Sequence, residues 1–407
     1  MTKEEKLWRR NAFAFLASQT LSLFGSSLVQ YAIMWYLTLN TKSGIVMSSF
    51  IICGFLPAFF ISPFAGVWAD RFSRKRLIIL ADALIAVVTL AMAILFAYGY
   101  DYIWLLLLAA AARAVGTGMQ TPAVGAVLPQ IVPQDRLTRV NGINSSIQAV
   151  ISFLSPMVSA LLLNYATMEI IFFVDVLTAA AAIVTLAALL DIPLHGKAQA
   201  KQVVSYFSDL RQGIAYIAGH PFLKTFFFFI ACFFVCISPV AFLPPLQVAR
   251  TFNSQVWHLT ALEIVFSTGM LFGGLLLTFW GGLRNKNHTL ACATLFFALS
   301  SFALGVVPVF WLYLVFYGLS GVAMPLFNTT ATVLLQEKVE EDFLGRVFGV
   351  LNMLSTSMLP LGMLFFGPVA DFVRIELLMA VSGMLLLLQG VLLLGSKKMT
   401  AAGAPQQ

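Results

Sequence analysis

Gly66-Val-Trp-Ala-Asp-Arg-Phe-Ser-Arg-Lys-Arg76 is a short charged stretch between two long apolar runs. It holds one acid, Asp70, and the cations Arg71, Arg74, Lys75 and Arg76. The glycine lets two helices approach closely, and the aspartate stands where a helix would leave a membrane. Clusters of Lys and Arg mark cytoplasmic turns between membrane-spanning helices. The stretch therefore predicts a tight cytoplasmic turn that joins two transmembrane helices.

The rest of the chain has the composition of a membrane protein. Of its 407 residues, 60% are hydrophobic and 10% are charged, whereas soluble proteins carry about 25% charged residues. A membrane-spanning helix needs about 20 apolar residues, and helices satisfy their own backbone hydrogen bonds in lipid. We expect an all-α polytopic membrane protein with 12 transmembrane helices. The expected spans cover residues 11–38, 45–67, 77–98, 103–127, 140–163, 170–190, 222–247, 258–282, 289–307, 310–334, 347–367 and 376–395.

The distribution of positive charge predicts the topology. Of the 24 Lys and Arg residues, 20 fall on the side that holds the N-terminus. Lys42, Arg250 and Arg374 fall on the opposite side, and Arg113 lies inside a span. Because Lys and Arg collect on the cytoplasmic side, we expect a multi-pass protein of the cell membrane with both termini in the cytoplasm. The net charge of +7 follows from this topology, and we expect no nucleic-acid partner.

A polar break divides the chain into two halves of six spans. Residues 191–220 form this break, and Tyr206, Leu210, Ile214 and Ile217 recur in it at helical spacing. This spacing indicates a short amphipathic helix on the membrane surface, with a plain linker as the alternative. We expect an N-terminal bundle over 1–193, a cytoplasmic linker over 194–220, a C-terminal bundle over 221–399 and a flexible tail over 400–407.

Two matched motifs indicate that the halves are duplicated. Leu137-Thr-Arg-Val-Asn-Gly142 matches Leu344-Gly-Arg-Val-Phe-Gly349, and each opens the fifth helix of its half. Gly118-x-x-x-Pro122 matches Gly321-x-x-x-Pro325 inside the fourth helix of each half. Duplicated halves around a site near the membrane midplane are a recurrent transporter architecture. The counterpart of the opening stretch, residues 281–286, keeps the turn and the cations but has no aspartate.

The opening stretch resembles the loop between helices 2 and 3 of the major facilitator superfamily, whose pattern is Gly-x-Leu-Ala-Asp-Arg-x-Gly-Arg-Arg. The chain departs from that pattern at Trp68 and Ser73. Within the superfamily it is similar to the bacterial macrolide-efflux and drug:proton antiporter branch, in Gly54-Phe-Leu-Pro57, Leu128-Pro-x-x-Val-Pro133 and Glu263-Ile-x-Phe-x-x-Gly-Met270. The resemblance covers essentially the whole chain, and it implies the major facilitator fold of two pseudo-symmetric six-helix bundles.

Ionisable residues within the spans are candidates for proton coupling, because a charge in the bilayer costs about 2.5–3.5 kcal/mol and must face protein or water. Arg113 begins Arg113-x-x-Gly-x-Gly118, which resembles the helix-4 motif of the superfamily. The resemblance implies a role for Arg113 in proton coupling, with a structural ion pair as the alternative. Glu263 can carry a proton if it is buried away from water. The alternatives are that it is permanently paired with a neighbouring group or is solvated at the outer end of its span. Asp175 is a third candidate, for proton transfer or for a structural hydrogen bond.

A cytoplasmic gate is expected around the opening stretch. Asp82, on the inner side of the third span, is expected to interact with the basic residues of the loop over 71–76. Asp70 is expected to contact the positive N-terminal end of the eleventh helix, near Arg346. The expected gate residues are Gly66, Asp70, Arg71, Arg74, Lys75, Asp82 and Arg346.

Uncharged polar side chains form stripes along several spans. Serine and threonine often join helices in membranes, but amides at several turns favour a water-accessible central cavity. A lining of aromatic and amide groups with few charges suits bulky amphiphiles better than small ions. The expected lining is Gln19, Gln30, Tyr31, Trp35, Thr117, Gln120, Asn144, Gln148, Ser267, Asn328 and Asn352.

The sequence holds no Gly-rich loop followed by Lys-Ser or Lys-Thr, so no ATPase is built into the chain. We expect no enzyme activity, no cofactor and no metal site, since no nucleophile–His–acid arrangement stands out. The resemblance implies a monomeric, proton-coupled exporter of amphiphilic small molecules that works by alternating access. The alternatives are a symporter or facilitator for a nutrient, organic acid or siderophore-like metabolite, and a lipid flippase.

Overall fold

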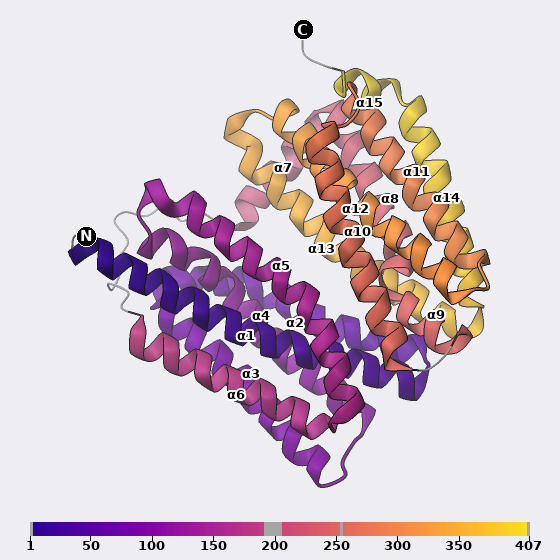
Figure 1. The fold of residues 1–407 in the computed structure, drawn as a ribbon. Coiled ribbons are helices and arrows are strands. Elements are labelled where there is room, and N and C mark those ends of the chain that lie inside the picture. Colours follow the sequence, from indigo (N-terminus) through magenta and orange to yellow (C-terminus); the bar gives the residue numbers. More distant parts are fainter. Residues whose placement is uncertain (1–2, 191–205, 253–254, 405–407) are drawn as a thin grey trace. The chain divides into compact units, whose positions relative to one another are not determined.

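The computed structural model describes residues 3–190, 206–252 and 255–404. Over these residues the secondary structure is helical and contains no strand (Figure 1). The helices are α1 (Lys3–Thr41), α2 (Gly44–Arg71), α3 (Arg74–Ala97), α4 (Ile103–Ile131), α5 (Gln134–Tyr165), α6 (Met168–Leu189), α7 (Tyr206–Gly219), α8 (Pro221–Phe242), α9 (Pro244–Thr251), α10 (Val256–Trp280), α11 (Lys286–Val306), α12 (Phe310–Lys338), α13 (Glu341–Phe372), α14 (Ile375–Gly395) and α15 (Lys397–Ala402).

Within the described ranges, 12 helical segments are long and apolar enough to cross a membrane. The predicted all-α polytopic fold is therefore confirmed. Several helices run past the apolar runs that predicted them. For example, α5 begins at Gln134 and α13 at Glu341, several residues before the expected spans, because helical hydrogen bonds continue where apolar side chains end.

One expected span, 222–247, is not a single helix. The helix α8 ends at Phe242 and α9 begins at Pro244. Pro244 and Pro245 have no backbone N–H to continue the helical hydrogen bonds, and the Leu243 N–H closes α8 by donating to the Pro239 carbonyl at 2.8 Å. Because of this break, α9 is a separate short helix, and Arg250 lies in its last turn.

The chain forms two compact units. The N-terminal unit comprises Met1–Leu37 and Ser49–Gln202, and the C-terminal unit comprises Thr38–Ser48 and Val203–Gln407. We call Thr38–Ser48, which joins α1 to α2, the hairpin tip. The sequence places it inside the expected N-terminal bundle, whereas its contacts place it in the C-terminal unit. Residues 191–205 of the expected linker lie outside the described residues.

The helix α7 packs on α13 within the C-terminal unit. The rings of Tyr216 and Phe343 stack with their centroids 4.3 Å apart. A Cβ at Gly213 would lie 2.9 Å from the Arg346 carbonyl oxygen, so the glycine lets the two helix backbones come close. The apolar side of α7 therefore faces protein at the start of α13.

Small residues bring the helices of each unit together. In the C-terminal unit, Gly269 and Gly273 of α10 face the α12 backbone at Gly318 and Val322. Gly321 of α12 faces α10 at Phe266, and in the N-terminal unit Gly118 of α4 faces α2 at Ala58. Close backbone approach at small residues is how membrane helices associate. The matched glycines Gly118 and Gly321 therefore have equivalent roles. In each unit, the glycine lets the fourth spanning helix pack closely against the second.

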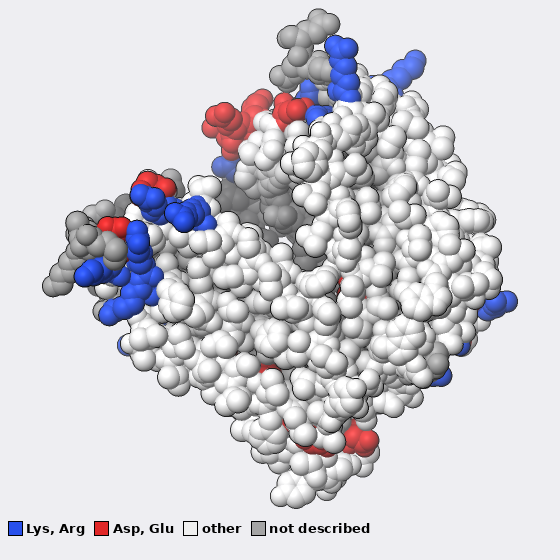
Figure 2. Space-filling view, viewed as in Figure 1, with Lys and Arg blue, Asp and Glu red and all other residues white. Residues whose placement is uncertain are grey.

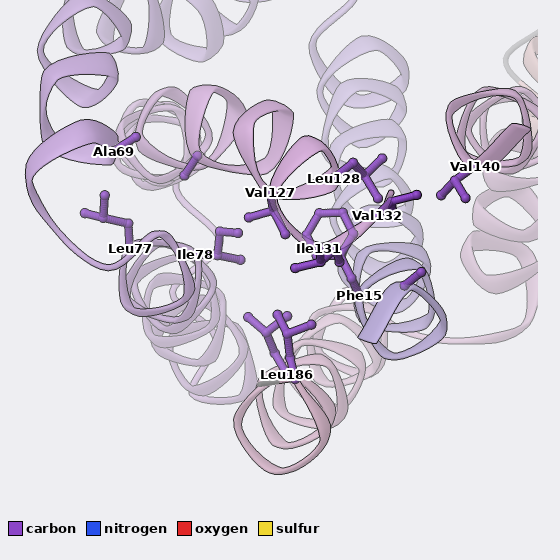
Figure 3. Packing of buried hydrophobic residues seen from close by; sticks show 13 residues of the cluster. Phe15, Ala69, Leu77, Ile78, Val127, Leu128, Ile131, Val132, Val140 and Leu186 are labelled. Atoms are coloured by element: carbon purple, nitrogen blue, oxygen red, sulfur yellow. The ribbon is translucent and has the colours of Figure 1, made fainter. Parts of the chain in front are cut away.

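An apolar cluster fills the end of the N-terminal unit where α1 and α3 begin and α4 and α6 end (Figure 3). Phe15, Ile78, Val127 and Leu186 come from these four helices and have no exposed surface. The apolar cluster consists of Ala12, Phe15, Ala69, Leu77, Ile78, Ala123, Val127, Leu128, Ile131, Val132, Val140, Leu186 and Leu190. It excludes water from this end of the core.

Charged side chains gather at the ends of the helices. On the face seen in Figure 2, the middle of each unit is nearly free of Lys, Arg, Asp and Glu. Large apolar side chains such as Phe228, Leu271 and Leu312 are exposed along the helices. A contiguous exposed apolar surface of this kind is expected where a protein meets lipid.

Candidate functional site

Two layers of polar side chains lie in the core of the N-terminal unit. The first, the Asp82 layer, joins α3 to α1 and α4. Ser22 Oγ donates to Asp82 Oδ1 at 2.6 Å, and Gln120 Nε2 donates to the same oxygen at 2.8 Å. Asp82 is 1% exposed. The sequence predicted that Asp82 would interact with the basic loop. The structure contradicts this prediction, because the Asp82 carboxylate accepts its hydrogen bonds from the neutral Ser22 and Gln120.

The second layer, the Arg113 layer, contains a buried ion pair. Arg113 Nη1 donates to Asp175 Oδ2 at 2.5 Å and to Thr89 Oγ1, and Nη2 donates to the Ser26 carbonyl at 3.3 Å. Thr89 Oγ1 donates in turn to Asp175 Oδ2 at 3.0 Å. The side chains of Arg113 and Asp175 are 11% and 1% exposed. Two of the predicted proton-coupling residues are therefore brought together, while their role in coupling stays a prediction.

The same helices supply both layers. Asp82 and Thr89 lie seven residues apart on α3, as do Arg113 and Gln120 on α4. Seven residues make two turns of a helix, so the layers are about 10 Å apart on the same faces. Gly25 of α1 faces α6 at the Arg113 layer, and a Cβ there would collide with Thr178 and Asp175. A glycine at this position lets α1 reach α6 beside the ion pair.

The predicted third proton-coupling residue, Glu263, lies on α10 in the C-terminal unit. Its side chain is partly buried, and it accepts no hydrogen bond from the described residues. Ser267 follows one turn later and is also partly buried. Glu263 therefore differs from Asp175, whose charge is already matched by a cation.

The basic residues of the opening stretch hold helix ends within the N-terminal unit. Arg74 donates to the Ala126 carbonyl of α4 at 2.7 Å, and Lys75 Nζ donates to the Ala187 and Leu190 carbonyls at 2.8 and 2.6 Å. Cations at carbonyl-rich helix C-termini are favourable. The side chains of Asp70 and Arg71 lie outside the described residues, so the contact expected between Asp70 and α13 stays a prediction.

The predicted cavity residues fall into groups by exposure. Gln30, Thr117, Gln148, Asn328 and Asn352 are exposed, and Tyr31, Asn144 and Ser267 are partly buried. Gln19, Trp35 and Gln120 are buried in the N-terminal unit, and the Trp35 ring lies 5.7 Å from that of Tyr31. These three side chains contribute to helix packing and do not line an open surface in this structure.

The hairpin tip is held by a carboxylate of α13. Asp371 Oδ1 accepts the Gly44 N–H at 2.6 Å, and Oδ2 accepts the Ile45 N–H at 2.9 Å and the Ser43 hydroxyl at 2.7 Å. These N–H groups open α2, where an anion is stabilised by the helix dipole. Arg250 donates to Asp371 Oδ1 at 2.5 Å and to the Lys42 carbonyl at 2.8 Å. We call Ser43, Gly44, Arg250 and Asp371 the clasp.

An open hollow of about 370 Å³ lies beside the clasp, lined by Arg250, Thr251 and residues 370–376. None of the predicted cavity residues lines it. Among the described residues, the polar layers hold buried charges between several helices, and the clasp holds a partly exposed ion pair beside the hollow.

Comparison with known proteins identifies the family. The family model for the Major Facilitator Superfamily matches residues 15–363. The chain belongs to the Major Facilitator Superfamily. It is therefore a multi-pass membrane transporter of small molecules, as the opening stretch predicted.

Curated relatives and solved structures cover nearly all of this transporter. Macrolide efflux protein A of Streptococcus pyogenes is 30% identical over 382 residues, 93% of this chain and 94% of that protein. Macrolide efflux protein A of Enterococcus faecalis is 29% identical over 323 residues, 79% of this chain and 99% of that protein. A peptide transporter structure gives a TM-score of 0.72 at 12% identity, covering both chains fully. The nucleoside transporter NupG gives 0.68 at 16% identity, covering 95% and 99%.

The clasp was missed by the sequence reasoning, although the transporter's sequence carries a signal for it. Gly66-Val-Trp-Ala-Asp70 and Gly367-Pro-Val-Ala-Asp371 share the pattern Gly-x-x-Ala-Asp. Gly367 lets α13 approach the start of α2, because a Cβ there would collide with Ser48. At Gly66 an added Cβ would meet nothing within 4 Å, so the close helix approach expected there from the sequence is found at Gly367 instead.

Replacing Asp371 with asparagine is expected to loosen the hairpin tip. Hydrogen bonds to a charged group contribute about 1.5–3 kcal/mol, so Asp371→Asn should raise local opening, and with it tryptic cleavage after Lys42, about tenfold or more. The fragment that ends at Lys42 is measured by mass spectrometry on the purified transporter. Glu376→Gln is the matched control, because Glu376 bonds Thr251 at 2.9 Å outside the clasp. Equal cleavage in the parent and both variants would show that the clasp does not hold the tip.

Proposed function

We propose that this transporter exports amphiphilic small molecules of the macrolide type by proton antiport through alternating access. Export is supported by the 30% identity, over 93% of the chain, to Macrolide efflux protein A of Streptococcus pyogenes. The similarity also covers 94% of that protein, so it extends over nearly all of both chains. The exposed amides Gln30, Gln148, Asn328 and Asn352 suit a bulky amphiphilic substrate.

Proton coupling is supported by ionisable groups at membrane depth. Such groups are rare within spans and mark proton or substrate pathways. The N-terminal unit places Arg113 and Asp175 in one pair, and the C-terminal unit places Glu263 without a described partner. We propose that substrate and protons occupy the site in turn, and that the cycle moves the two units in the cell membrane with both termini in the cytoplasm.

The clasp bears on alternating access. The helices α1 and α2 continue from the hairpin tip into the N-terminal unit, whereas the tip itself is bonded to the C-terminal unit. A cycle that moves the units must release the clasp or bend these helices, and Asp371 and Arg250 are the groups that would re-form it.

Transport into liposomes that contain the purified protein tests the proposal. With an acidic interior, antiport predicts uptake of a macrolide such as erythromycin against its gradient, since protons leave as the substrate enters. Protein-free liposomes correct for the passive trapping of weak bases, and an ionophore that collapses the pH gradient must abolish the signal. Uptake driven by an acidic exterior would instead establish a symporter, and a panel of dyes and organic acids would define its substrate. No gradient-driven movement of any of these compounds would reject the proposal.

A further inference from the structure

Asp82 differs from the other buried aspartate of the N-terminal unit in its charge balance. Asp175 is paired with Arg113, whereas the described hydrogen-bond partners of Asp82 are the neutral Ser22 and Gln120. Placing an ionised carboxylate in the core without a cation is costly. Binding one proton converts it to a neutral carboxylic acid and removes that cost.

The charged groups on the helices around Asp82 are already engaged. On α4 and α6 they are Arg113 and Asp175, which neutralise each other, and Glu169, which lies in the first turn of α6 away from Asp82. At the start of α3, Arg74 and Lys75 donate to main-chain carbonyls, and the Arg76 side chain is exposed. The α1 residues at this level are neutral. The core around both layers therefore holds one carboxylate more than it holds cations.

The two oxygens of the Asp82 carboxylate have different surroundings. Oδ1 accepts both hydrogen bonds, while Oδ2 is buried and has no partner among the described residues. Gln19 lies one turn from Ser22 on α1, and its Nε2 is likewise buried without a described partner. The Asp82 layer therefore contains a carboxylate oxygen with a free lone pair, which is the atom that can take a proton.

Access to Asp82 differs between its two sides. The apolar cluster lies toward one end, where Ile78 of α3 and Phe15 of α1 have no exposed surface (Figure 3). Toward the other side lies the Arg113 layer, where the Arg113 side chain is 11% exposed. The Asp82 layer is therefore bounded by buried apolar side chains on one side, while the nearest polar, partly exposed layer lies on the other.

We propose that Asp82 is the proton-binding carboxylate of the N-terminal unit, held through Oδ1 by Ser22 and Gln120 while the unpartnered Oδ2 takes the proton. Its use in transport rests on the proposed antiport, but proton binding itself does not. Asp175 is paired with Arg113 and holds that guanidinium in the neighbouring layer.

Infrared difference spectroscopy of the purified protein tests proton binding without any substrate. Lowering the pH from mildly alkaline to mildly acidic should produce the carbonyl stretch of a buried carboxylic acid. The part of this band that belongs to Asp82 should vanish in Asp82→Asn and persist in Glu263→Gln and in Asp371→Asn, which remove carboxylates outside the polar layers. If Asp82→Asn does not fold, Asp82→Glu keeps a carboxyl in the layer and must move the band. A band that is absent from the parent, or unchanged in the Asp82 variants, overturns the inference.

Transport then separates this inference from the proposed function. In Asp82→Asn, the ratio of erythromycin uptake with and without the pH gradient should fall to about 1, the value for an uncoupled site. Exchange of labelled for unlabelled erythromycin should continue, because it needs no net proton movement. Full gradient-driven uptake in Asp82→Asn would refute the role of Asp82 while leaving antiport intact. An infrared band in a parent that shows no gradient-driven uptake would reject antiport and leave proton binding at Asp82 intact.

Discussion

Replacing Arg113 with methionine is expected to destabilise the transporter by about 3–5 kcal/mol, because it leaves the Asp175 carboxylate buried without its cation. Asp175 is 1% exposed, so water cannot take the place of the lost guanidinium. Thr89 and the Ser26 carbonyl also lose a donor. Titration of the purified protein with SDS in mixed micelles measures the free energy of unfolding.

A double-mutant cycle decides what the Arg113–Asp175 pair is for. Asp175→Asn alone should also destabilise, since it strands the guanidinium, whereas Arg113→Met with Asp175→Asn should recover part of the loss because no buried charge remains. If the double variant also keeps gradient-driven transport, the pair is structural. If it is stable but no longer coupled, the pair belongs to the coupling machinery. A single Arg113→Met within about 1 kcal/mol of the parent would show that the ion pair carries little stability.

Replacing Glu263 with glutamine is expected to lower gradient-driven erythromycin uptake by at least about tenfold, equivalent to about 1.4 kcal/mol of coupling free energy. Glutamine keeps the size and the polarity of the side chain but cannot bind and release a proton. Glu263 has no described hydrogen-bond partner, so the substitution breaks no contact and should leave stability close to that of the parent. The transport loss is therefore attributable to the charge.

Glu376→Gln is the control for Glu263→Gln, since Glu376 lies at the start of α14 and bonds Thr251. Both variants should exchange labelled for unlabelled substrate at the parental rate. If Glu263→Gln and Asp175→Asn both keep full gradient-driven uptake, neither residue couples proton movement to transport. That outcome would leave Asp82 as the proton-binding group to test.

Composition and local pattern predicted the fold because lipid imposes a strict rule on the backbone. Every apolar run of membrane-spanning length must be helical, and 12 such segments are found in the described residues. The break at Leu243 also had a local signal in Pro244 and Pro245, which a hydropathy-based span passes over. Paired motifs such as Gly118-x-x-x-Pro122 and Gly321-x-x-x-Pro325 marked glycines that face equivalent helices.

The partners of the polar groups could not be predicted in the same way. Asp82 lies eight residues after Arg74 in the sequence, which made the basic loop its expected partner. In the structure, Arg74 turns to the main-chain carbonyls of α2 and α4. Asp82 meets side chains 60 and 38 residues away, Ser22 and Gln120. Pairings of this kind depend on which helix faces meet, and several alternatives are equally consistent with the sequence.

The sequence by itself determined that this protein is an all-α membrane protein of the major facilitator type, because apolar length, charge distribution and short motifs are local properties. Only the tertiary structure decided that Arg113 pairs with Asp175, that Asp82 stands without a cation, and that Asp371 holds the start of α2. The physical reason is that a charge within a membrane must find its partner across helices. The way the helices pack determines which partner the charge meets, and small residues such as Gly25 and Gly367 determine that packing.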